Sequence, residues 1–214
     1  MRSIALIDYG SGNLRSAEKA LLKASASLAN ACAIQTTDDP DVIARADAIV
    51  LPGVGAFAAC MDLVGAKAGL REAMTEAVRA RGAAFLGVCV GMQLLASAGL
   101  EFGETPGLDW IGGQVRRLEP SNRLFKVPHM GWNALDAVID HPVFKDAPKG
   151  AHMYFTHSFA FHPEADKDVA AWTDHGGAFP AAVARDNLVG VQFHPEKSQS
   201  AGLRLLANFL EWRP

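Results

Sequence analysis

Residues 83–91, the most informative segment of the sequence, read Ala83-Ala84-Phe85-Leu86-Gly87-Val88-Cys89-Val90-Gly91. Its first part, Ala83–Val88, is short and apolar throughout, which is typical of a strand buried on both faces. Cys89 then stands between two glycines, in the order glycine, any residue, nucleophile, any residue, glycine that marks a sharp strand-to-helix turn. The apparent helix Met92–Ala98 follows. We predict a strand that presents Cys89 at the edge of a sheet.

Short apolar runs also alternate with helical patterns towards the N-terminus. The predicted strands are Ser3–Tyr9, Ala31–Gln35 and Ala48–Leu51, and helical patterns cover 14–28, 41–45 and 70–81. Asp39 before Pro40 is typical of an N-cap followed by proline at the first helical position. This order predicts a parallel sheet covered by helices on both faces. Ligands bind at the carboxyl ends of such strands, so the turns after Tyr9, Leu51 and Val88 should share one functional edge.

From about Trp110 onward the pattern changes to further strands. They are predicted at Val115–Leu118, Ala151–Phe161, Val169–Thr173, Ala181–Ala184 and Leu188–Phe193, before a closing helix at Ala201–Trp212. We predict an α/β fold with a mostly parallel sheet, helices on both faces, and additional partly antiparallel strands attached to the same sheet. No repeat or low-complexity linker interrupts the sequence, so a single domain over residues 1–214 is expected.

Composition and charge exclude several classes of protein. Of the 214 residues, 50% are hydrophobic and 20% charged, which excludes a disordered chain. A net charge of −3 argues against a nucleic-acid-binding domain. The apolar start Ile4–Ile7 ends at Asp8, far short of the roughly 20 residues that span a bilayer, and no signal-peptide cleavage site follows. The three cysteines have no disulfide or zinc-site spacing. We expect a cytoplasmic protein without membrane or nucleic-acid partners.

The residues with catalytic potential lie at two strand ends. The thiol of Cys89 would sit at a helix N-terminus, which favours the thiolate, and the N–H of Val90 could point at an oxyanion. A nucleophilic cysteine needs a base and a group that orients it, and His194 and Glu196 can supply both because side chains two apart in extended chain share a side. The alternatives are a buried structural cysteine and a capped strand end. Taken together, the two motifs favour catalysis.

Two further features allow more than one interpretation. The turn Pro52-Gly53-Val54-Gly55 could supply a second oxyanion donor or be an ordinary tight turn. Five of the six other histidines form no convincing metal set, and we predict neither a metal nor a cofactor; they are His129, His141, His152, His157 and His162.

The motifs Gly87–Gln93 and His194–Glu196 together resemble the class I, triad-type glutamine amidotransferases. Within that superfamily, four blocks resemble the glutaminase subunits of imidazole glycerol phosphate synthases. The blocks are DYGSGN at 8–13, LPGVGAF at 51–57, KVPHMGWN at 126–133 and QFHPEKSQ at 192–199. They extend over nearly the whole chain, which makes the resemblance specific.

This resemblance implies a flavodoxin-like fold and the hydrolysis of glutamine to glutamate and ammonia. It also implies a partner in histidine biosynthesis, a (βα)8-barrel cyclase subunit that uses the ammonia to make imidazole glycerol phosphate and an aminoimidazole carboxamide ribotide. Carried over by position, Cys89 is the nucleophile, His194 the base and Glu196 its partner. Asn13, Lys126 and Trp132 lie in blocks associated with the subunit interface. A docked partner would also keep ammonia from water, which protonates it.

The resemblance further implies the groups that hold glutamine. They are Gly53, Val90, Gln93, the backbone of His157, Ser158 and Phe159, and Glu101 for the α-amino group. The oxyanion donors would be Val90 and, after rotation of the Gly53–Val54 peptide, Val54; in the resting subunit we expect that peptide to point its carbonyl inward. The sequence has Val90 where leucine is commoner and Phe159 where tyrosine is commoner. A free-standing cysteine hydrolase of another γ-glutamyl substrate and an inactive scaffold for the cyclase remain alternatives.

Overall fold

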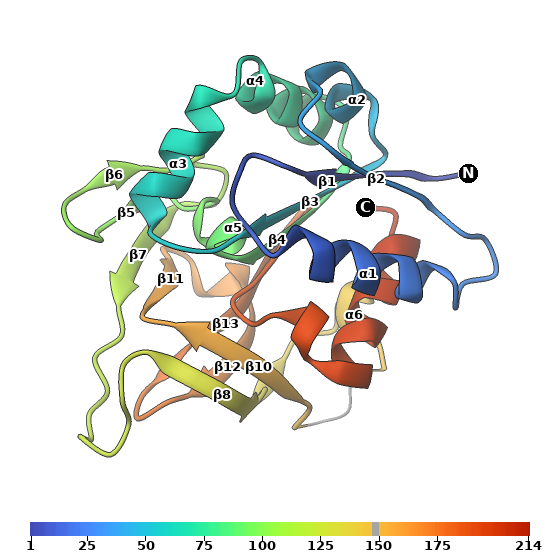
Figure 1. Ribbon diagram of the computed structural model, residues 1–214. Coiled ribbons are helices and arrows are strands. Elements are labelled where there is room, and N and C mark those ends of the chain that lie inside the picture. The colour runs from blue at the N-terminus through green and yellow to red at the C-terminus, as the bar shows by residue number, and fades with distance from the viewer. Residues whose placement is uncertain (147–149) are drawn as a thin grey trace.

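The computed structural model describes residues 1–146 and 150–214, and its centre is an eight-stranded sheet (Figure 1). The strand order is β2-β1-β3-β4-β14-β13-β12-β9. The first five run parallel, namely β2 (Ala33–Thr37), β1 (Ser3–Ile7), β3 (Ala48–Gly53), β4 (Ala84–Cys89) and β14 (Leu188–Val191). The antiparallel strands are β13 (Ala178–Arg185), β12 (Val169–Asp174) and β9 (Ala137–Val138). The predicted mostly parallel α/β sheet with extra antiparallel strands is confirmed.

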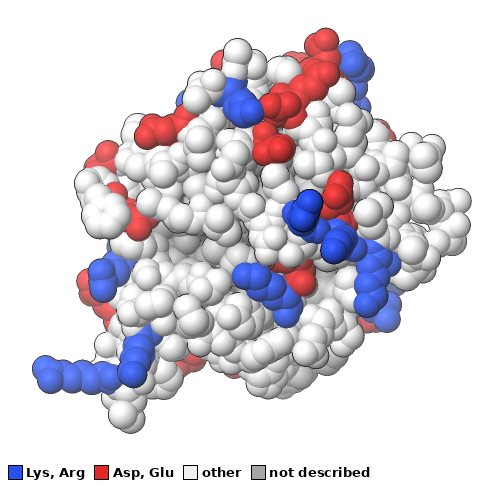
Figure 2. All heavy atoms as spheres, in the orientation of Figure 1, with Lys and Arg blue, Asp and Glu red and all other residues white. Residues whose placement is uncertain are grey.

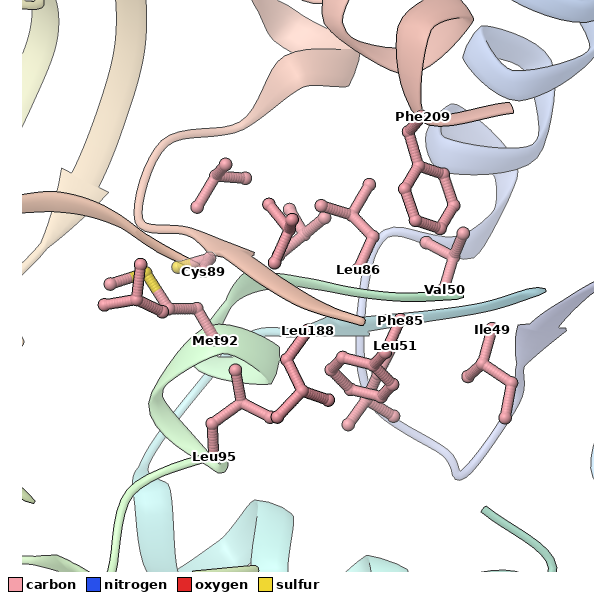
Figure 3. Packing of buried hydrophobic residues seen from close by; sticks show 14 of the residues in the cluster. Ile49, Val50, Leu51, Phe85, Leu86, Cys89, Met92, Leu95, Leu188 and Phe209 are labelled. Carbon is pink, nitrogen blue, oxygen red and sulfur yellow. The ribbon is translucent and has the colours of Figure 1, made fainter. Parts of the chain in front are cut away.

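Helices cover both faces of the parallel strands. One face carries α1 (Leu14–Ser25) and α6 (Gln199–Glu211); the other carries α2 (Pro40–Arg45), α3 (Phe57–Ala66), α4 (Leu70–Thr75), its π-helical continuation η1 (Glu76–Ala80) and α5 (Val90–Gln93). Figure 3 shows the alternation that this layering requires: Val50 and Leu86 point towards Phe209 of α6, while Phe85 and Leu51 point to the opposite side. Every residue of β3 and β4 is buried, because these strands are central to the sheet.

Two smaller sheets lie beside the main one. The first pairs β8 (His129–Ala134) with β10 (His152–His157), and the second has the order β11-β7-β5-β6, with β11 (Phe159–Pro163), β7 (Gly113–Arg117), β5 (Ala98–Gly99) and β6 (Thr105–Pro106). Single 3-10 turns are η2 (Pro142–Phe144), η3 (Asp166–Asp168) and η4 (Pro195–Lys197). The expectation that all the late strands join one sheet was therefore wrong.

Two predicted elements differ in ways that affect the site. The strand expected over Ala151–Phe161 is two strands, β10 and β11, which break at Ser158 and enter different sheets. The helix expected over Met92–Ala98 is only the single turn α5, because the carbonyls of Leu94 and Leu95 accept backbone N–H groups from the segment 108–111 instead of continuing the helix. A single turn has little macrodipole, so the predicted dipole effect on Cys89 carries little weight.

Candidate active site

The turn at Cys89 is strained and leaves no room for side chains on either flank. Cys89 has φ 55° and ψ −112°, a backbone conformation that is rare outside glycine. A Cβ on Gly87 would lie 2.4 Å from the carbonyl oxygen of Gly91, and a Cβ on Gly91 would lie 1.8 Å from that of Leu51. Both glycines are therefore required by close backbone packing. Figure 3 shows the cysteine at the end of the buried strand, with Met92 of α5 beside it.

The predicted base and its partner lie at the end of the neighbouring strand. In the parallel pair β4–β14, Val88 and Val191 are in register, so the chain leaving each strand emerges at the same edge. His194 Nδ1 lies 2.8 Å from Glu196 Oε1, and the Cys89 sulfur lies beside the histidine ring, whose buried Nε2 makes no hydrogen bond to a described residue. Glu196 lies in the 3-10 turn η4 rather than in extended chain, so the expected geometry was wrong although the contact forms.

Electrostatics keep the histidine charged at neutral pH. Burial alone lowers the pKa of His194, but the adjacent Cys89 sulfur and the Glu196 carboxylate outweigh this effect and raise the pKa to about 9. The Cys89 sulfur and the Glu196 carboxylate thus stabilise the imidazolium form of His194, although the ring is buried. A charged imidazole beside a sulfur nucleophile can donate a proton to a leaving group.

A cavity of about 280 Å³ opens over this edge. Most residues predicted to be at the site line it: Val54, Cys89, Val90, Gln93, Glu101, His157, Ser158, Phe159 and His194. Gly55, Thr156 and Lys197 complete the lining. Gly53 and Glu196 are not in the lining but adjoin it: Gly53 is paired with Cys89 across β3–β4, and Glu196 contacts Nδ1 of His194. The break between β10 and β11 is what places 157–159 in the wall.

Buried amides connect the walls of the cavity. Gln93 Nε2 donates to the carbonyl of Phe159 at 2.9 Å and to Gln192 Oε1 at 2.9 Å, and Gln192 Nε2 lies 3.6 Å from the Cys89 sulfur. Gln192 is fully buried, and it was not among the predicted site residues although it belongs to the QFHPEKSQ block. Glu101, also in the lining, accepts the N–H of Phe57 at its Oε2 at 2.9 Å and so caps α3.

The glycine-rich turn after β3 is held by Ser11, which was not among the predicted site residues either. Val54 N donates to Ser11 Oγ at 3.3 Å, Ser11 Oγ donates to Val54 O at 2.7 Å, and the Cys60 thiol lies 3.4 Å from the same carbonyl. The turns after β1, β3 and β4 therefore meet at one edge, as predicted. Within this arrangement the Val54 N–H is already occupied by Ser11.

The residues expected at a partner interface lie outside the cavity. Asn13, Lys126 and Trp132 are all exposed or partly exposed; Trp132 is 47% exposed and meets the Tyr154 ring edge-on at 5.9 Å. Trp132 is therefore not a core residue. Met130, on the same strand β8, is 65% exposed.

Three observations concern metal sites, membrane-spanning helices and basic surfaces. Within residues 1–146 and 150–214, no three His, Cys, Asp or Glu side chains are grouped as a metal site. No helix in the same ranges is both long and apolar enough to cross a membrane. Figure 2 shows basic and acidic side chains interspersed over one face of the molecule, without a continuous basic surface.

Comparison with known proteins gives the family. The model for "Glutamine amidotransferase class-I" matches residues 5–212. The chain is 60% identical to imidazole glycerol phosphate synthase subunit HisH of Caulobacter vibrioides over 100% of both chains. It is 50% identical to that of Rhodopseudomonas palustris over 99% of this chain and 100% of the relative.

Solved structures are similar in fold. A crystal structure of a glutamine amidotransferase has a TM-score of 0.70 at 19% identity and covers 97% of both chains. A second, of a glutamine amidotransferase from Thermotoga maritima, has a TM-score of 0.59 at 16% identity, over 91% of this chain and 76% of that one. The solved structures support the fold, and the family model and the close relatives show that the chain is an enzyme of the class I glutamine amidotransferases, in the family of imidazole glycerol phosphate synthase HisH subunits.

Proposed function

We propose that the chain hydrolyses glutamine to glutamate and ammonia with Cys89, His194 and Glu196, and passes the ammonia to a (βα)8-barrel cyclase subunit in histidine biosynthesis. The observation that carries the proposal is the convergence of these side chains at the ends of two adjacent parallel strands, beside a cavity of about 280 Å³. The predicted cytoplasmic location is part of the same proposal.

The chemistry begins with attack of the Cys89 sulfur on the side-chain carbonyl carbon of glutamine. The resulting oxyanion accepts the N–H of Val90 and, after the turn rotates, that of Val54. The imidazolium of His194 then donates its proton to the departing nitrogen, which leaves as ammonia, and a thioester remains on Cys89. His194, now neutral, takes a proton from water, which attacks the thioester and releases glutamate. Glu196 keeps the ring oriented and stabilises its charged form.

The cavity offers the groups that this substrate needs. The carboxylate of Glu101, in the lining, is a partner for the α-amino group, and the backbone of His157, Ser158 and Phe159 is available for the polar ends of the amino acid. The amide of Gln93 fixes the Phe159 carbonyl and thereby the shape of that part of the lining. Phe159 has no hydroxyl, so it contributes through its backbone and ring alone.

A partner that receives ammonia fits the chemistry of the product. Neutral ammonia is the nucleophile, and water at pH 7 would protonate it, so a docked subunit preserves it by excluding water. Occupation of the Val54 N–H by Ser11 leaves the oxyanion site one donor short in the isolated chain. We therefore expect the cyclase and its nucleotide ligand to stimulate glutamine hydrolysis by about 10²–10³-fold, the contribution of one such donor.

The decisive experiment compares two nitrogen sources in the assembled complex. Cys89→Ala should abolish cyclase turnover with glutamine and preserve it with ammonium salts, because Cys89 serves only the amide-hydrolysing half. Equal loss with both sources, in a complex shown to be assembled, would contradict this division. A free-standing hydrolase would instead reach its full rate without the cyclase, and an inactive scaffold would release no glutamate in any condition.

A further inference from the structure

A chain of four polar groups runs behind the substrate wall. Asn133 Nδ2 lies 3.3 Å from His129 Nε2, His129 Nδ1 lies 3.1 Å from His157 Nε2, and His157 Nδ1 lies 2.9 Å from the carbonyl oxygen of Phe159. His129 is 3% exposed and His157 is 7% exposed. The chain begins on β8, crosses to β10 and ends in the first residue of β11, so it links both small sheets to the cavity.

The groups at the two ends of this series of hydrogen bonds determine which nitrogen of each imidazole ring carries the proton. The orientation of the Asn133 amide is set by two other bonds, since Nδ2 also donates to the carbonyl of Asp174 at 2.7 Å and Oδ1 accepts the N–H of Ala134 at 2.9 Å. Nδ2 can only donate, so His129 Nε2 is an acceptor and the His129 proton is on Nδ1. It follows that His157 Nε2 accepts and that the His157 proton is also on Nδ1, where it is donated to Phe159.

Both imidazole rings are neutral at physiological pH. This is required because, in the series of hydrogen bonds from Asn133 to Phe159, each ring accepts at one nitrogen and donates from the other. Burial, reinforced by the neighbouring His157 and His175, lowers the pKa of His129 to about 3. Burial also lowers the pKa of His157 to about 4, against the raising effect of its bond to Phe159 and with the help of His175 and His194. Around the pair, His175 faces the His129 ring at a centroid distance of 4.1 Å and donates elsewhere, since its Nε2 lies 2.8 Å from the carbonyl of Lys126.

The end of the chain is a point where two walls of the cavity meet. The Phe159 carbonyl accepts both from His157 and from Gln93 Nε2, each at 2.9 Å. His157, Phe159 and Gln93 all line the cavity, whereas His129 and Asn133 do not touch it. His157 is therefore the hydrogen-bonded link between His129 and the cavity.

We propose that His129 is a positioning residue for glutamine: its Nδ1–H holds the His157 ring in the tautomer that donates to Phe159, and so fixes the 157–159 backbone against which the substrate binds. This inference rests on the proposed function, because it concerns the same substrate. It predicts that His129 acts as a hydrogen-bond donor and not only as a packed ring. The His129 ring also stacks on Phe155 at a centroid distance of 4.7 Å, and a phenylalanine ring at position 129 could make the same contact.

Two substitutions at position 129 distinguish the hydrogen-bond donor of His129 from the packing of its aromatic ring. His129→Phe keeps an aromatic ring against Phe155 but removes the donor, whereas His129→Asn keeps an amide N–H near the position of Nδ1. In the assembled complex, we expect His129→Phe to raise KM for glutamine about three- to tenfold, the equivalent of one neutral hydrogen bond, with kcat within about twofold of wild type. His129→Asn should restore most of the affinity. His152→Gln, at the exposed start of β10, is the matched control and should change neither constant.

The tautomers of His129 and His157 can be measured directly. This measurement needs neither enzyme activity nor a folded variant, because it uses the wild-type protein. Nitrogen NMR of the imidazole rings in the wild-type chain should show both His129 and His157 protonated at Nδ1. Protonation of either ring at Nε2 overturns the inference, and so does an unchanged KM in folded His129→Phe. If the wild-type complex hydrolyses no glutamine, the proposed function fails, while the NMR result still decides whether the chain of hydrogen bonds exists as described.

Discussion

The side-chain oxygen of Ser11 bonds both backbone groups of Val54: it accepts the Val54 N–H at 3.3 Å and donates to the Val54 carbonyl at 2.7 Å. These two bonds tie the turn after β1 to the glycine-rich turn after β3. An N–H that is held in this way cannot stabilise an oxyanion until the bond breaks. Gly55 has φ +98° and no atom within 4 Å of the position that a Cβ would take, so this side of the turn has a residue of wide backbone freedom in open space.

Removal of the Ser11 hydroxyl should therefore raise the basal activity. In Ser11→Ala, the rotated state no longer has to compete with the two bonds, and we expect the chain alone to hydrolyse glutamine about three- to tenfold faster. The measurement is glutamate release with and without the cyclase, whose stimulation should shrink by the same factor. Ser27→Ala, which loses only a local bond at the end of α1, is the control. A basal rate equal to wild type would show that Ser11 does not restrain the turn.

The glycines of the strained turn predict a sharp contrast in stability. Gly91→Ala would place a methyl group 1.8 Å from the Leu51 carbonyl oxygen, so we expect it to lower the free energy of unfolding by about 3 kcal/mol or more, or to prevent folding. Gly65→Ala, in open space within α3, should stabilise the protein by up to about 1 kcal/mol. Denaturant unfolding of the two variants tests this contrast; similar midpoints would show that the turn is more plastic than its geometry implies.

The triad should respond unequally to loss of its two supporting residues. His194→Ala removes the group that moves protons, and we expect glutamine hydrolysis in the complex to fall by about 10²–10⁴-fold. Glu196→Ala leaves the imidazole in place and removes its orienting acceptor at 2.8 Å, so the loss should be smaller. Steady-state rates of both variants give the order. A His194→Ala enzyme with the wild-type rate would exclude the residue from the mechanism.

The charged state of His194 predicts how activity and stability depend on pH. Its pKa, about 9 in the folded protein, lies above the ordinary 6.5, so the stabilisation that it provides is complete below pH 6.5 and is lost as the pH rises through 9. The proton donated to the leaving ammonia disappears over the same range. We expect the rate to fall above about pH 9, and Glu196→Gln to move this fall to lower pH. An alkaline limb that stays in place in Glu196→Gln would contradict the role assigned to the carboxylate.

The sequence was sufficient for the parallel core and for the residues at its edge, because each signal there is local. Short apolar runs and the N-cap Asp39, whose side chain accepts the N–H of Asp41, act through their own neighbours in the chain. The glycines on either side of Cys89 were recognisable from their spacing alone, although Gly91 packs against the distant carbonyl of Leu51. The missed elements depend on distant partners. The helix α3 has no capping side chain of its own and is capped by Glu101, and β8, which contains Gly131, forms only by pairing with β10.

The same distinction applies to the site. His194 and Glu196 are two residues apart, so their contact could be anticipated from spacing. Ser11 and Gln192 reach Val54 and Cys89 across 43 and 103 positions, and nothing local distinguishes them from other polar residues. The pairing of His129 with His157 was likewise hidden, because scattered histidines show no pattern until β8 and β10 bring them together.

Trp132 provides a test of the partner surface. It is 47% exposed on β8, near Met130 at 65%, and exposed aromatic residues of this kind supply much of the affinity when an interface buries them. We expect Trp132→Ala to weaken binding of the cyclase by about 30-fold or more, corresponding to roughly 2 kcal/mol. Because the indole contacts Tyr154 only edge-on, the free energy of unfolding should change by about 1 kcal/mol or less. Titration calorimetry against the cyclase measures the first effect, and Leu22→Ala, which truncates a side chain 50% exposed on α1, is the control. A folded Trp132→Ala variant that binds with wild-type affinity would place the docking surface elsewhere on the molecule.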